Sequence, residues 1–216
     1  MPETDFENIS DGIEVRSLDQ KQSNARIEKR DDGQEWLAGY ASVFFNANEP
    51  ESTEFHLFDN YYERFMPGCF DVQARNFDIV SLFNHESSRI LGRRSAQTLE
   101  IGVDGVGLWY RVLLDDTTTA NDLRKNINRR DVTGSSLQFE AKRQRRNVEG
   151  ERIIREIYAA DIKEVGPVTF PAYSGTSVEI ARRSLDLMTH AYEAEEVLSQ
   201  ADELLLQMDL DDAMRS

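Results

Sequence analysis

Short runs of alternating apolar and polar residues fill the middle of the chain, and this pattern is typical of strands. We expect strands at 35–46, 77–83, 132–145 and 152–170. The run at 97–114 alternates on both sides of Asp104-Gly105, which predicts a β-hairpin. A further turn is expected at Glu149-Gly150, and a bend near Ala159-Ala160. The segment 55–71 mixes aromatic residues with a Pro-Gly break, so an irregular or partly helical connection is expected there.

One short helix interrupts these strands. Leu123 and Ile127 lie four residues apart in "TTANDLRKNINRR", with Thr119 or Asn121 as the expected N-cap. Hairpins, and not helical crossovers, therefore connect the strands. This favours an α+β fold with a closed or partly closed barrel, or a sandwich, over a doubly wound parallel sheet.

The two ends of the chain differ from this middle part. Residues 1–34 are polar and predict an arm that is disordered or adds one edge strand. Residues 184–216 have helical periodicity and many acidic residues. This segment is either a solvated surface helix or an acidic tail that binds a partner. The expected organisation is an arm at 1–34, a domain at 35–183 and an acidic helical tail at 184–216.

Composition excludes several classes of function. The 216 residues carry a formal charge of -15, which disfavours nucleic acid as the main partner. The single cysteine, Cys69, excludes an internal disulfide and a multi-cysteine metal site, and it is consistent with a reducing compartment. The three histidines are scattered and form no H-E-x-x-H motif, so no metal site is expected. The sequence has no Gly-rich phosphate loop, so no cofactor is expected either. No apolar run predicts a signal peptide or a membrane span.

His85 stands at the end of the apolar run "DIVSLF", where a rigid strand could hold a general base at a rim. A structural histidine is the alternative interpretation. His56 has no obvious partner in the sequence, and His190 falls on the acidic helix, where a solvated side chain is expected.

A nucleophile is suggested by "TGSSLQF", in which a glycine precedes two serines at the start of a strand. Ordinary turn chemistry explains the same pattern, and the pattern is not a G-x-S-x-G elbow. Cys69, after a Pro-Gly turn, is either reactive or a small buried hydrophobe. For a carboxylate behind the histidine, Glu164, Asp161 and Asp78 are the candidates.

The basic stretch Lys142–Arg155 is unusual in so acidic a chain. It is either a solvated hairpin tip, a patch for acidic protein surfaces, or the source of an arginine near an oxyanion. The sequence leaves these alternatives open.

Six short motifs, taken in order, resemble the tailed-phage (caudovirus) prohead serine protease family. They are "GYASVF", "MPGCF", "LFNHESSRILGR", "GVGLWYRVLLDDT", "TGSSLQF" and "IKEVGPVTFPAYSGTSV", and they span about 35–183. The order of the set is more specific than any single motif. The chain departs from the family pattern at Cys69, at Leu137 and Gln138 where Phe-Gly is common, and at Gly166 where serine is usual.

The resemblance implies a β-barrel ringed by short helices, similar to herpesvirus assemblin. It implies a serine endopeptidase that uses His85 as general base, Ser136 as nucleophile and Glu164 as the third catalytic member, without a cofactor. Backbone N–H groups, with an arginine from 142–146, would stabilise the oxyanion. A non-enzymatic scaffold or assembly protein with the same fold is the alternative, and a cysteine hydrolase that uses Cys69 is a third.

The same resemblance implies where the chain acts and on what. Its partner would be the major capsid protein with its scaffolding segment, cleaved inside the assembling prohead in the host cytoplasm. The family often cleaves itself as well, so self-association and self-processing are expected. No nucleic acid and no membrane are expected as partners.

Overall fold

The longest element of the molecule is an antiparallel hairpin of two strands, β11 (Gly134–Glu149) and β12 (Arg152–Val168). In this computed structural model the described residues are 6–7, 12–70, 78–171 and 182–191, together with 193–194, 197–198, 200–201 and 207. Gly150, with a positive φ of 65°, makes the turn of the hairpin, as expected from the sequence. The register of the two strands shifts at three places, and the expected bend at Ala159-Ala160 lies opposite two of them.

The first sheet is built on this hairpin. Its strands pair in the order β1-β11-β12-β6-β5, where β1 is Phe6–Glu7, β5 is Phe55–Phe58 and β6 is Tyr61–Phe65. β2 (Glu14–Leu18) also pairs with β11, and β7 (Val80–Leu82) pairs with β12 and with β8 (Ile90–Arg93). The β6 and β7 pairings with β12 are parallel, and the other pairings of the sheet are antiparallel.

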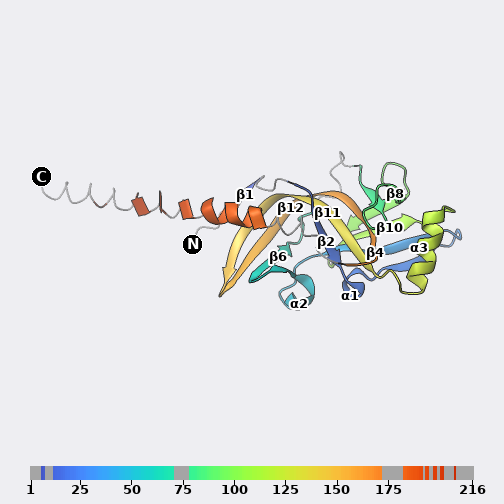
Figure 1. The fold of residues 1–216 in the computed structure, drawn as a ribbon, viewed down its shortest axis with the longest axis horizontal. Helices are drawn as coiled ribbons and strands as arrows, with labels where there is room; N and C mark the ends of the chain where they lie inside the picture. The colour runs from blue at the N-terminus through green and yellow to red at the C-terminus, as the bar shows by residue number, and fades with distance from the viewer. Residues whose placement is uncertain are drawn as a thin grey trace, which may run out of the picture.

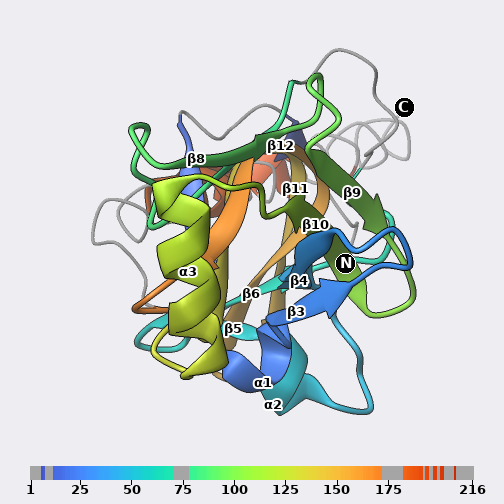
Figure 2. The same ribbon diagram turned by 90° about the vertical axis from the view of Figure 1, so that its right-hand side faces the viewer.

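The second sheet has the order β3-β4-β10-β9, with all neighbours antiparallel. Its strands are β3 (Arg26–Lys29), β4 (Glu35–Val43), β9 (Leu99–Val103) and β10 (Gly107–Leu113). Figures 1 and 2 show this sheet beside the end of the first sheet that carries β8. The strand at 35–46 and the hairpin around Asp104-Gly105 are confirmed.

The fold is α+β and mostly strand, as predicted, but the expected barrel is wrong. Neither sheet closes, because in the described part of the chain the outer strands β3 and β9 of the small sheet pair with no strand of the large one. The two sheets share one hydrophobic core instead, which contains residues of β4, β6, β10 and β11. The core therefore joins the sheets by side-chain packing and not by a continuous ladder of hydrogen bonds.

Three helices are short. They are α1 (Gln20–Ser23), α2 (Pro50–Thr53) and α3 (Thr118–Asn128). The expected helix at α3 is confirmed, with Leu123 and Ile127 buried, but the N-cap is Thr117, whose side chain accepts from the Ala120 N–H. The segment 55–71 differs from the irregular connection that was expected, because β5 and β6 form a hairpin through Asp59 (φ 43°). None of the described helices is long and apolar enough to cross a membrane.

The two terminal segments are packed more closely than the sequence indicated. The polar segment 1–34 contains β2, α1 and β3, and Leu18 is fully buried in the core. At the other end, residues 182–191 are helical, and Leu185 and Met188 are buried against Leu57 of β5. Expectations for the rest of the acidic tail fall mostly outside the described residues.

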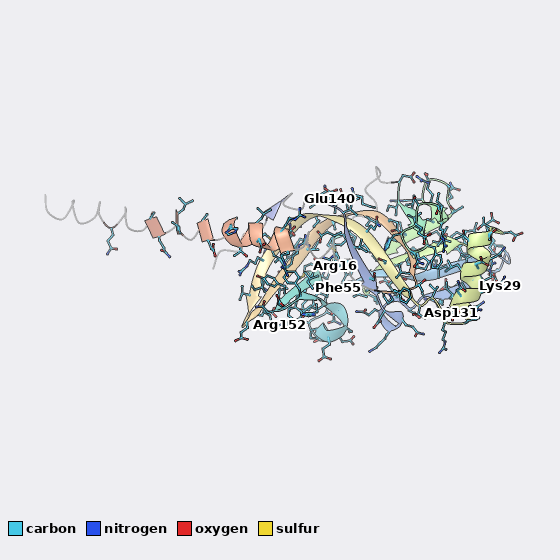
Figure 3. All side chains as sticks on the ribbon, viewed as in Figure 1. Arg16, Lys29, Phe55, Asp131, Glu140 and Arg152 are labelled. Atoms are coloured by element: carbon cyan, nitrogen blue, oxygen red, sulfur yellow. The ribbon has the colours of Figure 1, made fainter. Side chains whose placement is uncertain are left out.

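Charged residues are also buried inside the first sheet. Glu14 and Arg16 of β2, Glu63 of β6 and Arg155 of β12 are all fully buried, and they form a network of ion pairs at 2.6–2.9 Å. Figure 3 labels Arg16 in the middle of the molecule. Burial by itself raises the pKa of Glu14, but the charges and hydrogen bonds of Arg155 and Arg16 outweigh it and hold this pKa at about 2.

This network makes stability depend on pH. Because the pKa of Glu14 is lower in the folded chain than its ordinary value of 4.5, its charge stabilises the fold above that value. The contribution is lost as the pH falls toward about 2. We expect Glu14→Gln to lower the free energy of unfolding by about 3 kcal/mol at pH 7, since it leaves two buried arginines undercompensated. The difference from wild type should shrink steadily as the pH falls from 4.5 to 2.

Urea unfolding monitored by circular dichroism at several pH values measures this difference. Glu51→Gln, on the exposed face of α2, is the matched control and should differ little from wild type at any pH. A Glu14→Gln difference that stays constant between pH 7 and pH 2.5 would contradict the expectation.

Candidate functional site

The pairing of β11 with β12 determines where the candidate residues meet. Ser136 lies opposite Gly166, and Gln138 lies opposite Glu164. Side chains two apart on a strand share a face, and directly paired residues share it too, so Ser136, Gln138 and Glu164 all project from one face of the sheet. Ser135 belongs to the other face, where its hydroxyl and the Tyr110 hydroxyl lie 2.8 Å apart in the core.

His85 reaches this face from the loop after β7. Asn84 and His85 both have positive φ (56° and 60°), which is uncommon for residues other than glycine. Three hydrogen bonds of Asn84 hold the loop: its N–H donates to the Pro167 carbonyl at 3.1 Å, its Oδ1 accepts from the Thr169 N–H at 2.8 Å, and its Nδ2 donates to Thr169 Oγ1 at 3.1 Å. Strained backbone held by surrounding hydrogen bonds is common at functional sites.

Gly166 permits this approach. A Cβ at position 166 would lie 2.0 Å from the Leu82 carbonyl oxygen and 3.2 Å from Glu164 Oε1. Any side chain there would push the end of β7 away from β12, and His85 would move with it. The glycine at this position, where the family usually has serine, is therefore a packing requirement of this chain.

The three candidate residues form a connected chain of hydrogen bonds. His85 Nε2 lies 2.9 Å from Ser136 Oγ, and His85 Nδ1 contacts Glu164 Oε2. Glu164 is nearly buried, and its second oxygen, Oε1, accepts from the Leu82 N–H at 3.4 Å. The carboxylate thus faces the ring nitrogen that must carry a proton if Nε2 is to act as a base.

Gln138 is a further neighbour of the imidazole. Its side-chain nitrogen lies 3.1 Å from His85 Nδ1, beside the Glu164 contact. Glycine is common at this position in the family pattern, so this contact belongs to the present chain. The motif identified the position as a departure but gave no sign that its side chain would touch His85.

Ser136 is fully buried, while the His85 side chain is 23% exposed. Besides His85, two atoms of β2 lie against its oxygen: Ser136 Oγ donates to the Arg16 carbonyl at 3.0 Å, and Ser17 Oγ donates to Ser136 Oγ at 3.1 Å. Sequence reasoning missed both contacts, because residues 1–34 were read as an arm.

The other candidates lie elsewhere. Asp161 lies near Lys142 and Lys163, and Asp78 pairs with Arg93. His56 is exposed, and its Nε2 lies 2.9 Å from the Asp59 carbonyl oxygen. His190 is also exposed, near Glu193.

Cys69 is buried in the core, and burial raises the pKa of its thiol far above the ordinary value. Such a thiol is not poised as a nucleophile.

The basic stretch Lys142–Arg155 follows the distal part of the β11–β12 hairpin. Lys142 is six residues beyond Ser136 on the same strand, or roughly 20 Å away. Many of its charges meet partners within the chain: Lys142 pairs with Glu140, Arg152 with Glu54, and Arg155 with Glu14. These residues are placed to stabilise the hairpin and not to contact Ser136.

A family model described as caudovirus prohead serine protease matches residues 22–191, which is well over half of the chain. No curated protein and no solved structure matches the chain. The likeness to herpesvirus assemblin therefore stays a prediction. The match includes His85, Ser136 and Glu164 and ends three residues after Met188, but it begins after β2. The chain belongs to the caudovirus prohead serine protease family.

Proposed function

We propose that the chain is a serine endopeptidase that cleaves the scaffolding segment of the major capsid protein inside the assembling prohead. The observation that carries this proposal is the connected contact of Ser136, His85 and Glu164 in a chain of this family. Cleavage of the chain itself, and contact between its copies in the prohead, are part of the same proposal. The family match does not favour the non-enzymatic alternative.

In this mechanism, Ser136 Oγ attacks the carbonyl carbon of the scissile peptide bond and transfers its proton to His85 Nε2. The electrons of the carbonyl double bond move to its oxygen. When the tetrahedral intermediate collapses, the C–N bond breaks and His85 gives the proton to the leaving amine. Water then repeats the sequence on the acyl-enzyme, with His85 again as base, and releases the free carboxylate and Ser136.

Glu164 holds the imidazole for both proton transfers. Its carboxylate accepts from Nδ1–H, so Nε2 is the free base, and its negative charge stabilises the imidazolium that forms. Because Glu164 is nearly buried, water screens this interaction weakly. The Leu82 N–H, which donates to Oε1, helps to fix the carboxylate.

The neighbouring serines give a matched pair of variants. We expect Ser136→Ala to abolish processing of the cognate major capsid protein on co-expression, because the nucleophilic oxygen is lost. Ser135→Ala removes a hydroxyl of the same type from the opposite face of the same strand. It should cost about 1–3 kcal/mol of stability through the Tyr110 contact, but processing should continue. Gel analysis of the capsid protein distinguishes the variants, and processing by Ser136→Ala would refute the assignment.

Glu164→Gln tests whether the negative charge of Glu164 supports His85. We expect kcat to fall by about 10²–10⁴ with little change in KM, since the side chain orients His85 and does not touch the substrate. Asp161→Asn on the same strand is the control, and it should keep wild-type kinetics because its neighbours are lysines. Equal kinetics for the two variants would remove Glu164 from the mechanism.

Burial of Cys69 separates the serine and cysteine mechanisms. We expect the native chain to resist iodoacetamide, because burial raises the pKa of the thiol and holds it protonated, and processing should survive the treatment. In urea the same thiol should react fully. Intact mass measures the modification. Loss of processing in step with alkylation of Cys69 in the native chain would favour the cysteine hydrolase instead.

A further inference from the structure

Ser17, on β2, lies directly against the proposed nucleophile. β2 pairs antiparallel with β11, and its register places Ser17 opposite Ser136. Their hydroxyl oxygens are 3.1 Å apart, with Ser17 as the donor. The family match begins at residue 22, so it does not cover Ser17.

The contacts of Ser136 Oγ fix the direction of these hydrogen bonds. A serine hydroxyl has one proton to donate and two lone pairs to accept with. The proton can be donated to the Arg16 carbonyl at 3.0 Å or to His85 Nε2 at 2.9 Å. Ser17 donates to a lone pair in either case, so it is a hydrogen-bond donor aimed at the atom that becomes negatively charged when the proton leaves.

Many serine proteases stabilise the oxyanion with backbone N–H groups near the nucleophile. That source is restricted here, because β11 has a strand on each side. Ser136 lies between Gly166 and Ser17, and Leu137 lies between Val165 and Arg16. The N–H groups of such a central strand lie in the plane of the sheet and bond to the neighbouring strands, whereas the Ser136 side chain projects out of that plane.

Arg16 and the basic stretch Lys142–Arg155 do not fill this role either. The guanidinium of Arg16 projects to the other face of β2, where it bonds to Glu63 and Glu14. The basic stretch that begins at Lys142 is roughly 20 Å along β11. The Ser17 hydroxyl, by contrast, lies within hydrogen-bond distance of Ser136 Oγ.

We propose that Ser17 is a further catalytic residue, whose hydroxyl stabilises the negative charge of the tetrahedral intermediate. This proposal rests on the proposed serine endopeptidase function. As Ser136 Oγ bonds to the carbonyl carbon and His85 takes its proton, negative charge builds on the carbonyl oxygen, one carbon away from Oγ. Rotation of the Ser17 hydroxyl transfers its hydrogen bond from Oγ to that oxygen, and Ser17 keeps its own proton throughout.

The backbone at Ser17 is held firmly enough for this task. The residue before it, Arg16, is anchored by buried ion pairs, and the residue after it, Leu18, is fully buried in the core. Ser17 itself is only partly buried. A donor on a fixed backbone needs little reorganisation at the moment of reaction.

The test compares Ser17→Ala with Ser17→Thr in the full chain. The readout is the rate at which diisopropyl fluorophosphate labels Ser136, followed by intact mass, because the phosphoryl oxygen of this probe acquires charge as the carbonyl oxygen does. Ser17→Ala should label about 10²-fold more slowly than wild type. Ser17→Thr keeps the hydroxyl and suits a strand, so it should label within a few-fold of wild type.

Two further measurements exclude a merely structural effect. Thermal unfolding should place both variants close to wild type. The shape of the rate-against-pH curve should be the same in Ser17→Ala as in wild type, since Ser17 acts on the negative charge of the intermediate and not on the imidazole. Equal rates for Ser17→Ala and wild type, or equal losses in the Ala and Thr variants, would refute the role of Ser17.

Failure of the proposed function gives a different result. If wild type is not labelled, or is labelled as much as Ser136→Ala, the serine mechanism fails, and the role of Ser17 fails with it. If wild type is labelled at Ser136 and Ser17→Ala retains the full rate, only the role of Ser17 is refuted.

Discussion

The antiparallel ladder between β11 and β12 is the constraint on which the site depends. Its register puts Ser136 opposite Gly166 and Gln138 opposite Glu164, so the proposed nucleophile and the proposed third member project from adjacent strands on one face. A slip of one residue would turn Ser136 toward the core and bring Ser135 to the surface of the site. The length of the hairpin and the core packing of Leu137 and Val165 protect against such a slip.

His85 depends on the same strand in a different way. β7 pairs in parallel with β12 at Glu164 and Val165, and the loop after β7 is tied to Pro167 and Thr169 at the end of β12. The histidine and its carboxylate are thus positioned by neighbouring segments of the same strand, 79 residues from His85 in sequence. The absence of a side chain at Gly166 lets the two backbones approach.

Sequence patterns predicted the turns and the helix that depend on local interactions. The hairpin at Asp104-Gly105, the turn at Gly150 and the helix with Leu123 and Ile127 all follow from residues close together in the chain. The prediction of Ser136 over Ser135 came from a family motif, and the pairing of β11 with β12 puts Ser136 on the same face as Glu164. Glu164 was the least obvious residue, because periodicity cannot show that a strand carboxylate faces an imidazole from another segment.

Residues 14–18 show why the rest could not be predicted. The sequence "EVRSL" has two charged residues that normally indicate solvent, so the segment was read as part of a polar arm. In the fold, Glu14 and Arg16 are fully buried, because their partners Glu63 and Arg155 come from strands far along the chain. The open sheets could not be predicted for the same reason. Packing between distant elements decides whether the outer strands of two sheets pair, and the alternation within each strand is the same in an open sheet and in a closed barrel.

The buried charges also bear on the chemistry. A buried ion network is costly to form, and replacing one by apolar residues is often neutral or stabilising. The network fixes β2 against β6 and β12, and β2 places the Arg16 carbonyl and the Ser17 hydroxyl on Ser136. β2 thus places two groups on the Ser136 oxygen: the Arg16 carbonyl, which accepts its proton, and the Ser17 hydroxyl, which donates to it. In the proposed mechanism the Ser136 proton turns from the Arg16 carbonyl to His85, and negative charge then builds on the substrate carbonyl oxygen. In that mechanism the position of β2 governs both the resting state of Ser136 and the stabilisation of this charge by Ser17.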